Sequence, residues 1–481
     1  MSGGGAVSRP TGPVMVQRSR ADIIDRNGQI LAKNIYKFNL EMDSRRVQDK
    51  DRLVLFVREL FPDISTATIL HHIESGRRNI VLRTDIGRDK ANAIRRQRIE
   101  GLVIVQRQAR EYPMQNAMSH IVGFVHSSGQ GAEGLELILN ERLSNDMTPV
   151  RLSIDSRIQG IMRTELNAAL TEFSAKSAMG ILMNARTGEI LAIVNVPDFD
   201  PENINKYPVI NRRFRIMQDN FEMGSIFKIF TSAMALANGM PPSQTFDVVT
   251  PFLIAGRPVG EVTGFRPPAR NLNIAQIFQF SSNSGSAQIA LSFPDNVQQD
   301  FFRDLLLYQP IQTDFGRTAR PIRPRSNTKT DRSRWAFGHG ISVTPMHLML
   351  ASNAMINDGM FVMPTIFRRD FVPQSRQIIP REVSRQIRQM MYVTGETTGR
   401  QAANQIHGIR IGGKTSTAEK PIAGGYSRTE FLTGYFVAFP IEAPKYSMLI
   451  LLDRPMRRPV FASQNAVPLA GRIMNAVIPM L

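Results

Sequence analysis

Three short motifs in the last two-thirds of the chain constrain its fold more than any other feature of the sequence. Their first residues are 56 and 133 positions apart, and they read Ser225-Ile226-Phe227-Lys228, Ser281-Ser282-Asn283 and Lys414-Thr415-Ser416-Thr417. Each motif alone is weak evidence. Together and in this order they supply a nucleophile, a base, a proton relay and an anion-binding strand edge. A fold that uses all three must bring these distant segments to one place.

The first motif is predicted to begin a buried helix. Residues 226–238 are apolar on nearly all sides, and Gly239 follows as a stop signal. Ser225 would lie at the helix N-terminus, where free backbone N–H groups favour a developing oxyanion. Lys228 lies on the same face, and burial lowers the pKa of its ammonium, so its neutral amine can take the serine proton. The alternative is a capping serine followed by a lysine that reaches solvent.

The second motif lies between two segments predicted as helices, residues 271–280 and 288–291. In the catalytic interpretation, Ser281 relays a proton between Lys228 and the leaving group, and Asn283 orients the substrate amide. The run Ser-Ser-Asn-Ser-Gly is otherwise typical of an ordinary loop.

The third motif is predicted to be an edge strand. Lys414 and Thr415 would hold a substrate carboxylate. The backbone N–H of Thr417, together with that of Ser225, would form an oxyanion hole, in which a single donor accounts for roughly 10²–10³ in rate.

The third motif also fits a phosphate-binding pattern. Residues 408–415 have P-loop spacing, and residues 448–453 resemble a metal-binding strand end. We reject a P-loop NTPase because the lysine and threonine of a P-loop begin a helix, whereas Pro421 soon interrupts this segment. Only 67 residues follow Lys414, too few for a doubly wound nucleotide-binding domain.

The length of 481 residues predicts more than one domain. We expect a flexible N-terminus at 1–20, a mixed α/β non-catalytic domain at 21–149 and an α+β domain at 150–481. The pair Asn27-Gly28 predicts a two-residue hairpin turn near the start of the middle region. Its other predicted elements are helices at 50–75 and 88–98 and strands at 80–83 and 102–106.

Two apolar hairpins at opposite ends of the third region are predicted to share one antiparallel sheet. A final helix at 468–478 would cover this sheet, with Pro468 at its first position. The region between the hairpins, residues 220–395, reads as mostly helical, so the class is α+β. The hairpin strands are residues 178–184 with 189–196 and residues 432–439 with 446–452.

The amino-acid composition limits which classes of cofactor and partner the chain can have. The chain has no cysteine, which excludes disulfides and thiolate metal sites, and His71-His72 lacks a metal-binding pattern. The net charge is +18, but the densest basic stretch, residues 317–334, has no interleaved aromatic residue, so we expect no nucleic-acid partner. This stretch is either a solvated loop or a contact surface for an anionic partner. No apolar run is long enough to predict a transmembrane helix.

With these motifs in place, the chain resembles the class B penicillin-binding proteins, and most closely their division-specific FtsI type. The resemblance covers nearly the whole chain. It implies a penicillin-binding transpeptidase domain, with an antiparallel sheet of about five strands flanked by helices, preceded by a dimerisation-like pedestal domain. Beyond the three motifs it rests on Asp25-Arg-Asn-Gly28, His120-Ile-Val-Gly-Phe-Val125, Gly131-Ala-Glu-Gly-Leu-Glu136, Thr187-Gly-Glu-Ile-Leu-Ala192 and Gly338-His-Gly-Ile-Ser-Val-Thr-Pro345.

The resemblance implies a serine D,D-transpeptidase that cross-links peptidoglycan stem peptides through an acyl-enzyme on Ser225, the residue that β-lactam antibiotics would also acylate. It implies no metal or organic cofactor. The implied partners are a SEDS-type glycan polymerase and other division proteins. An N-terminal membrane anchor, missing from this chain, would hold the protein at the periplasmic face of the bacterial inner membrane. Within the family, Asn283 favours the septal type over the elongation type.

Two residues depart from the family pattern. Ser416 stands where glycine is usual; it either points behind the strand without effect, or slows acylation and shifts antibiotic affinity. Met223 replaces a usual proline, a change that we expect to be mild. The alternatives to a septal enzyme are an elongation-type transpeptidase, a hydrolase such as a β-lactamase, and a weakly catalytic β-lactam sensor or scaffold of the same fold.

Overall fold

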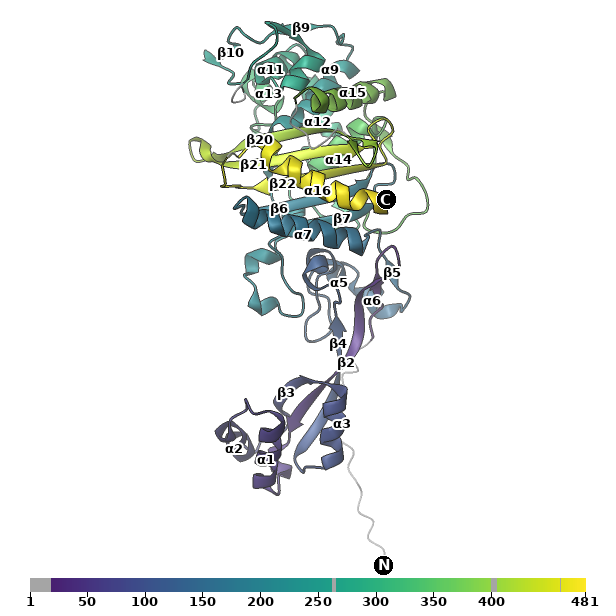
Figure 1. Ribbon diagram of the computed structural model, residues 1–481, viewed down its shortest axis with the longest axis vertical. Helices are drawn as coiled ribbons and strands as arrows, with labels where there is room; N and C mark the ends of the chain where they lie inside the picture. Colours follow the sequence, from purple (N-terminus) through teal and green to yellow (C-terminus); the bar gives the residue numbers. More distant parts are fainter. Residues whose placement is uncertain (1–18, 262–264, 399–404, 459) are drawn as a thin grey trace, which may run out of the picture.

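The computed structural model describes residues 19–261, 265–398, 405–458 and 460–481. The N-terminus expected to be flexible, residues 1–20, therefore lies almost wholly outside the described residues. The molecule is elongated: a small N-terminal head is joined by a narrow neck to a larger block that contains the long sheet (Figure 1).

The larger block is built around a five-stranded antiparallel sheet in the order β20-β21-β22-β6-β7. The pairing of β22 with β6, in which Ile450 lies opposite Gly180, joins the C-terminal hairpin to the earlier one. The two predicted hairpins therefore share one sheet, and the α+β class is confirmed. The strands are β6 (Ser177–Asn184), β7 (Ile190–Val196), β20 (Gly412–Ile422), β21 (Gly425–Phe439) and β22 (Tyr446–Asp453).

Helices cover both faces of this sheet. On one face, α7 (Ser156–Glu172) and α16 (Ala466–Val477) share a hydrophobic cluster with alternate sheet residues such as Ile450. On the other face, α14 (Pro345–Ile356) and the helix of the first motif pack in a second cluster with residues such as Leu449. Every residue of β7 is buried, which explains why its sequence shows no polar alternation.

The last helix begins two residues before its predicted start. Asn465 caps it by accepting the N–H of Ala466, so Pro468 is the third helical residue and not the first. This place is tolerated because the N–H groups of the first helical turn have no partner within the helix.

The region between the hairpins is mostly helical, as predicted. Besides α14 its helices are α8 (Arg215–Gln218), α9 (Lys228–Ala237), α10 (Ile274–Phe280), α11 (Asn283–Leu291), α12 (Asp295–Asp304), α13 (Lys329–Trp335) and α15 (Arg381–Thr398). Short ladders pair β8 (Phe221–Glu222) with β15 (Ser342–Val343), β9 (Thr245–Asp247) with β12 (Asn271–Asn273), β10 (Leu253–Ile254) with β11 (Arg257–Pro258), β13 (Gln312–Thr313) with β14 (Gly316–Arg317), β16 (Met360–Phe361) with β17 (Arg376–Gln377), and β18 (Gln405–Ile406) with β19 (Ile409–Arg410).

The basic stretch at 317–334 is only partly the exposed segment that its charge suggested. Its last residues lie in α13, where Arg332 is buried and donates to the carbonyl oxygen of Phe293 at 2.7 Å. The guanidinium of Arg323 stacks over the ring of Tyr308, 4.2 Å from its centroid. These two arginines therefore contribute to packing within the block.

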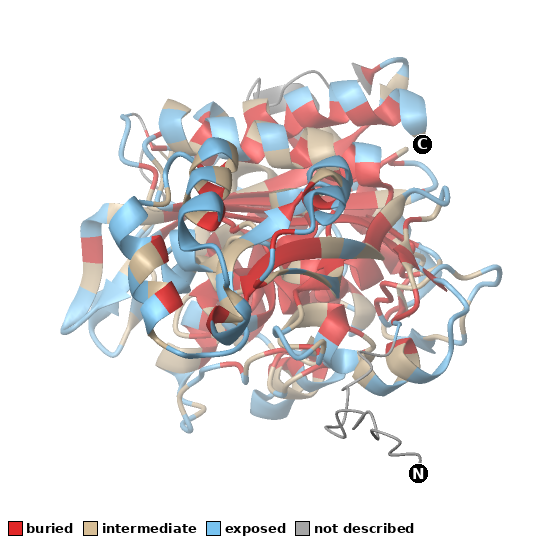
Figure 2. Cartoon of the chain, turned by 90° about the horizontal axis from the view of Figure 1, so that it is seen from below, coloured by how far each residue is buried: buried red, intermediate tan, exposed pale blue. Residues whose placement is uncertain are grey.

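The head is a small α/β unit with its own core, which includes Leu40, Val57 and Ile94. The predicted helix at 50–75 is two helices, separated by a turn at Pro62. Seen along the long axis of the molecule, the outer faces of the helices in front are exposed, while strands of the five-stranded sheet in the larger block behind them are buried (Figure 2). The elements are β2 (Ile30–Met42), β3 (Ile80–Ile86), β4 (Leu102–Glu111), α1 (Lys50–Leu60), α2 (Thr66–Glu74) and α3 (Arg88–Gln97), with β2 paired to both other strands.

The hairpin predicted at Asn27-Gly28 is present, but its loop is longer than two residues. β1 (Ile23–Ile24) pairs with β2 so that Ile24 lies opposite Ile30. Asp25 Oδ1 closes the loop by accepting the N–H of Asn27 at 2.7 Å, and Gly28 adopts a φ of 89°. On its other side β1 runs parallel to β5 (Val150–Arg151).

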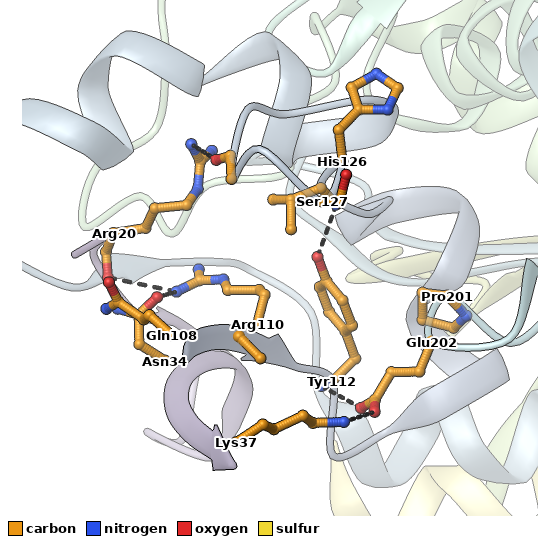
Figure 3. Close-up of a pocket in the computed structure, with 13 residues that line it drawn as sticks. Arg20, Asn34, Lys37, Gln108, Arg110, Tyr112, His126, Ser127, Pro201 and Glu202 are labelled. Carbon is orange, nitrogen blue, oxygen red and sulfur yellow. Dashed lines mark hydrogen bonds and ion pairs between the residues drawn. The ribbon is translucent and has the colours of Figure 1, made fainter. Parts of the chain in front are cut away.

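A buried ionic cluster holds the neck. Arg20 Nε donates to Glu136 Oε2 at 2.9 Å, and Arg110 Nε donates to Glu136 Oε1 at 2.7 Å. The neighbouring cavity of about 250 Å³ is lined on its far side by Tyr112, whose N–H donates to the Glu202 carboxylate at 3.1 Å (Figure 3). Short helices complete the neck: α4 (Ser119–Val122), α5 (Gly134–Ile138) and α6 (Asn140–Asn145).

The neck packs as part of the larger block. Ile23, Tyr112 and Leu135 of the neck belong to the same hydrophobic cluster as Met179 in the sheet, whereas the core of the head is separate. The packing boundary therefore runs through the long strands β2 and β4.

Candidate active site

The first motif lies where a 3₁₀ turn passes into a buried helix. Gly224–Phe227 form the turn, and α9 follows from Lys228, so the regular helix starts slightly later than predicted. All residues from Lys228 to Leu236 are buried, as the apolar pattern indicated. Phe227 and Phe230 pack edge to face with ring centroids 5.1 Å apart. This packing fixes the backbone that carries Ser225 and Lys228.

The Lys228 amine lies at the centre of the first two motifs. Lys228 Nζ is 3.0 Å from Ser225 Oγ, 3.0 Å from Ser281 Oγ and 2.7 Å from Asn283 Oδ1, and it donates to the Ser281 carbonyl oxygen at 2.6 Å. Ser281 Oγ is also 3.0 Å from Ser225 Oγ. The structure thus brings a hydroxyl nucleophile, an amine and a second hydroxyl within hydrogen-bond distance of one another.

The electrostatic environment favours the neutral form of this amine. Complete burial lowers the pKa of Lys228 well below its usual value, and the positive charge of Lys414 lowers it further. The carboxylate of Glu261 opposes these two effects. A lysine with a lowered pKa can act as a base toward the neighbouring serine hydroxyl.

A strained backbone conformation places the side chain of Ser281. Ser281 follows α10 and adopts a left-handed φ of 58°, while Ser282 caps α11 by accepting the N–H of Gly285 at 3.0 Å. The two helices predicted around this motif are present, and the second is longer than predicted because it begins at Asn283. The serine pair therefore forms a tight corner between helices.

The third motif lies on β20, the edge strand of the sheet, as predicted. The Lys414 side chain is buried, and its Nζ is 3.1 Å from Ser281 Oγ, which connects the third motif to the second. Thr415 and Thr417 are half-buried, and Thr417 Oγ1 accepts the N–H of Ala462 at 3.0 Å. The strand conformation of Lys414 and Thr415 agrees with our rejection of a P-loop, in which they would begin a helix.

Ser416 faces the segment that carries the nucleophile. A Cβ placed on Gly224 would lie only 2.5 Å from Ser416 Oγ, and Ser416 itself is buried. The alternative that Ser416 points behind the strand is therefore wrong. Its hydroxyl is buried and has no hydrogen-bond partner among the residues that the structure describes.

Two stacked aromatic rings lie beside the nucleophile segment. The rings of His339 and Tyr426 stack with centroids 5.1 Å apart, and Tyr426 Oη donates to Glu222 Oε1 at 3.3 Å. Burial, followed by the charges of Lys228 and Arg334, lowers the pKa of His339 to about 4. His339 is thus neutral near neutral pH.

A cleft of about 420 Å³ opens beside the same segment. Its lining includes Phe221 and Glu222, which lie just before Ser225, and Pro421, which lies just after the third motif on β20. No residue of the three motifs is among the described residues that line this cleft, which lies on the side of the nucleophile segment formed by Phe221 and Glu222.

Sequence reasoning missed Glu261. It lies in the loop after β11, and its carboxylate contacts the second motif 22 residues away, where Oε2 accepts the N–H of Asn283 at 2.7 Å. A single glutamate in a Gly- and Pro-containing loop carries no sequence signal for such a contact. No group of three or more His, Cys, Asp or Glu side chains suited to a metal occurs within the described part of the chain.

Two family descriptions match this chain. Residues 178–477 match the "Penicillin binding protein transpeptidase domain", and residues 16–149 match the "Penicillin-binding Protein dimerisation domain".

Several curated proteins and solved structures are similar over most of the chain. A protein named probable peptidoglycan D,D-transpeptidase FtsI from Caulobacter vibrioides is 30% identical, with 97% of this chain and 82% of the relative covered. One named probable peptidoglycan D,D-transpeptidase PenA from Neisseria meningitidis is 26% identical, with 96% and 84% covered. The crystal structure of Penicillin Binding Protein 2X from Streptococcus thermophilus superposes with a TM-score of 0.80 at 18% identity, covering 96% of this chain and 79% of that chain.

Proposed function

This chain belongs to the class B penicillin-binding proteins, and on that premise we propose that it is a serine D,D-transpeptidase that cross-links peptidoglycan stem peptides during septal wall synthesis. The observation that carries the proposal is the convergence of the three motifs. Ser225 Oγ, Lys228 Nζ and Ser281 Oγ are mutually within 3.0 Å, and Lys414 Nζ joins them at 3.1 Å from Ser281 Oγ.

The first half of the reaction forms an acyl-enzyme. Ser225 Oγ attacks the carbonyl carbon between two D-alanines and gives its proton to neutral Lys228 Nζ. The developing oxyanion is held by the backbone N–H groups of Ser225 and Thr417. The C–N bond then breaks, and the leaving D-alanine amine takes a proton through Ser281.

The second half transfers the acyl group. The amine of a neighbouring stem peptide attacks the ester, the bond from the acyl carbon to Ser225 Oγ breaks, and the proton that the amine loses passes through neutral Lys228 to Ser225 Oγ. In the first half, before D-alanine leaves, Asn283 orients the donor amide, and Lys414 with Thr415 binds the terminal carboxylate. Ser416 follows Thr415 on β20, and its side chain fills part of the space between this strand and Gly224. A β-lactam follows only the first half, because the nitrogen that leaves stays tethered to the acyl group.

The septal assignment rests on Asn283 and on the FtsI and PenA relatives, and an elongation enzyme is the alternative within the family. The expected partners are a SEDS-type glycan polymerase and other division proteins, which would contact the pedestal at 21–149 and a membrane anchor. The expected location is the periplasmic face of the inner membrane. No helix in the described ranges has the length and apolar character needed to span a membrane.

Labelling with a fluorescent penicillin tests the activity. We expect one antibiotic per chain by intact mass, with the adduct lost in Ser225→Ala and kept in the matched control Ser292→Ala, an exposed serine at the end of α11. An adduct that survives for many minutes contradicts the β-lactamase alternative. If the folded wild-type protein forms no adduct, the transpeptidase proposal is wrong and the sensor or scaffold alternative is favoured.

A further inference from the structure

We propose that Glu261 is a positioning residue for the second motif, holding the N-terminus of α11 so that Asn283 and Ser281 meet Lys228. The inference rests on the proposed function, because it assigns a supporting role within the same site. Glu261 is half-buried, and its hydrogen bonds within the described residues go to Ser282, Asn283 and Ser284.

The Glu261 carboxylate uses both oxygens on α11. Oε2 accepts the N–H of Asn283 at 2.7 Å, and Oε1 accepts the N–H of Ser284 at 3.0 Å and the hydroxyl of Ser282 at 2.7 Å. The hydroxyl of Ser284 donates to Oε1 as well. These donors include backbone N–H groups of the first helical turn, which no carbonyl within a helix can satisfy. A negative charge is favoured at this end of a helix.

The same loop fixes which way the Asn283 amide points. Asn283 Nδ2 donates to the carbonyl oxygen of Gly260 at 2.8 Å, so its Oδ1 is the atom that faces Lys228 Nζ at 2.7 Å. If the amide were reversed, its NH₂ group would point at the amine and the Gly260 carbonyl would lose its donor. The loop at 260–261 therefore sets the orientation of a side chain that contacts the base.

Glu261 also balances charge around the base. Among the described residues, the charged or titratable groups that interact electrostatically with Lys228 are Lys414 on β20, His339 in the turn beside the nucleophile, and Glu261. Lys414 lowers the pKa of Lys228, His339 is neutral, and Glu261 supplies the opposing negative charge. Because the amine must be neutral to take the serine proton, the acid limb of the acylation rate reports the pKa of Lys228.

The test measures acylation by a fluorescent penicillin against pH for the wild type, Glu261→Gln, Glu261→Asp and the exposed control Glu100→Gln in the head. Glu261→Gln cannot accept at both positions, so acylation should slow by about tenfold to 10²-fold. Loss of the negative charge should move its acid limb to lower pH by about half a unit or more. Glu261→Asp keeps the charge, so its limb should stay at the wild-type pH and its rate should lie between those of the wild type and Glu261→Gln.

The outcomes separate the two proposals. An unlabelled wild type rejects the transpeptidase function. A labelled wild type with an unchanged rate and limb in Glu261→Gln rejects the role of Glu261. A slower rate in Glu261→Gln without a shift of the acid limb also rejects the role of Glu261, since a partly unfolded protein would give the same result. If Glu261→Gln does not fold, Glu261→Asp decides, because a wild-type rate in that shortened variant contradicts positioning by this carboxylate.

Discussion

The chemistry of this site depends on one buried lysine that gives up its charge. Lys228 lies among hydroxyl, carbonyl and amide oxygens, and burial beside Lys414 lowers its pKa. Its amine therefore becomes neutral at a pH well below the usual value of 10.5. A base of this kind accepts a proton only above its own pKa, so acylation should rise with pH through the lowered pKa and be lost below it.

Replacing Lys228 by arginine tests this reasoning at the residue scale. A guanidinium keeps the positive charge but does not lose its proton in proteins, so Lys228→Arg should slow penicillin acylation by roughly 10²–10⁴-fold at every pH. The measurement is the rate of fluorescent adduct formation from about pH 5 to pH 9, on the acid side of the usual lysine pKa of 10.5. Lys50→Arg, an exposed lysine in the head, is the control. A Lys228→Arg rate that matches the control would show that another group takes the serine proton.

The contact between β20 and the nucleophile turn shows how closely two elements can approach. Gly224 has a φ of 53°, and a Cβ there would clash with the Ser416 hydroxyl. Because Gly224 has no side chain, the Ser416 side chain fits against it. The buried Ser416 hydroxyl has no hydrogen-bond partner among the described residues. A buried hydroxyl without a hydrogen bond costs about 1–3 kcal/mol.

Ser416→Ala should therefore raise the free energy of unfolding by about 1 kcal/mol, because it removes that hydroxyl and keeps the Cβ that the site already accommodates. Acylation should stay within a few-fold of the wild type. Ser416→Val, which adds bulk against Gly224, should slow acylation and lower the melting temperature. Thermal unfolding and penicillin labelling of the two variants provide the check, and a less stable Ser416→Ala would mean that the hydroxyl has a partner, such as an ordered water.

At the level of elements, short-range signals in the sequence predicted most of the fold. The apolar runs of β6, β7, β21 and β22, the all-round apolar helix α9 and the edge strand β20 were all recoverable, because burial leaves a direct pattern in composition. The start of α16 was misplaced because Pro468 suits any position in the first turn and the cap at Asn465 was overlooked. The contact from Glu261 could not be predicted, because it joins a loop to a helix 22 residues away and depends on tertiary packing alone.

On the scale of the whole molecule, one hydrophobic core of the larger block extends across residues 149–150 into the neck. The residues that flank the head, such as Ile23 and Tyr112, pack in the core of the larger block, and the separate core begins further along β2 at Phe38. Arg20, Glu136 and Arg110 connect the first described residues, α5 and β4 at the neck. The ionic cluster therefore ties together three segments of the neck that carries the head.

Glu136→Gln should loosen the neck while leaving the active site intact. The substitution leaves two buried arginines without a countercharge, and breaking a buried ion pair in this way costs about 3–5 kcal/mol. Hydrogen exchange should accelerate in 20–36 and 107–145, and the melting temperature should fall. Penicillin labelling at Ser225 should persist at 25 °C, because the side-chain hydrogen bonds of Arg20, Arg110 and Glu136 in the described part of the chain all go to other neck residues and not to the three motifs. The matched control is Glu111→Gln, whose partner Lys33 is 3.0 Å away at the surface and whose loss should cost about 1 kcal/mol or less. Equal exchange in the two variants would show that the buried cluster does not hold the neck.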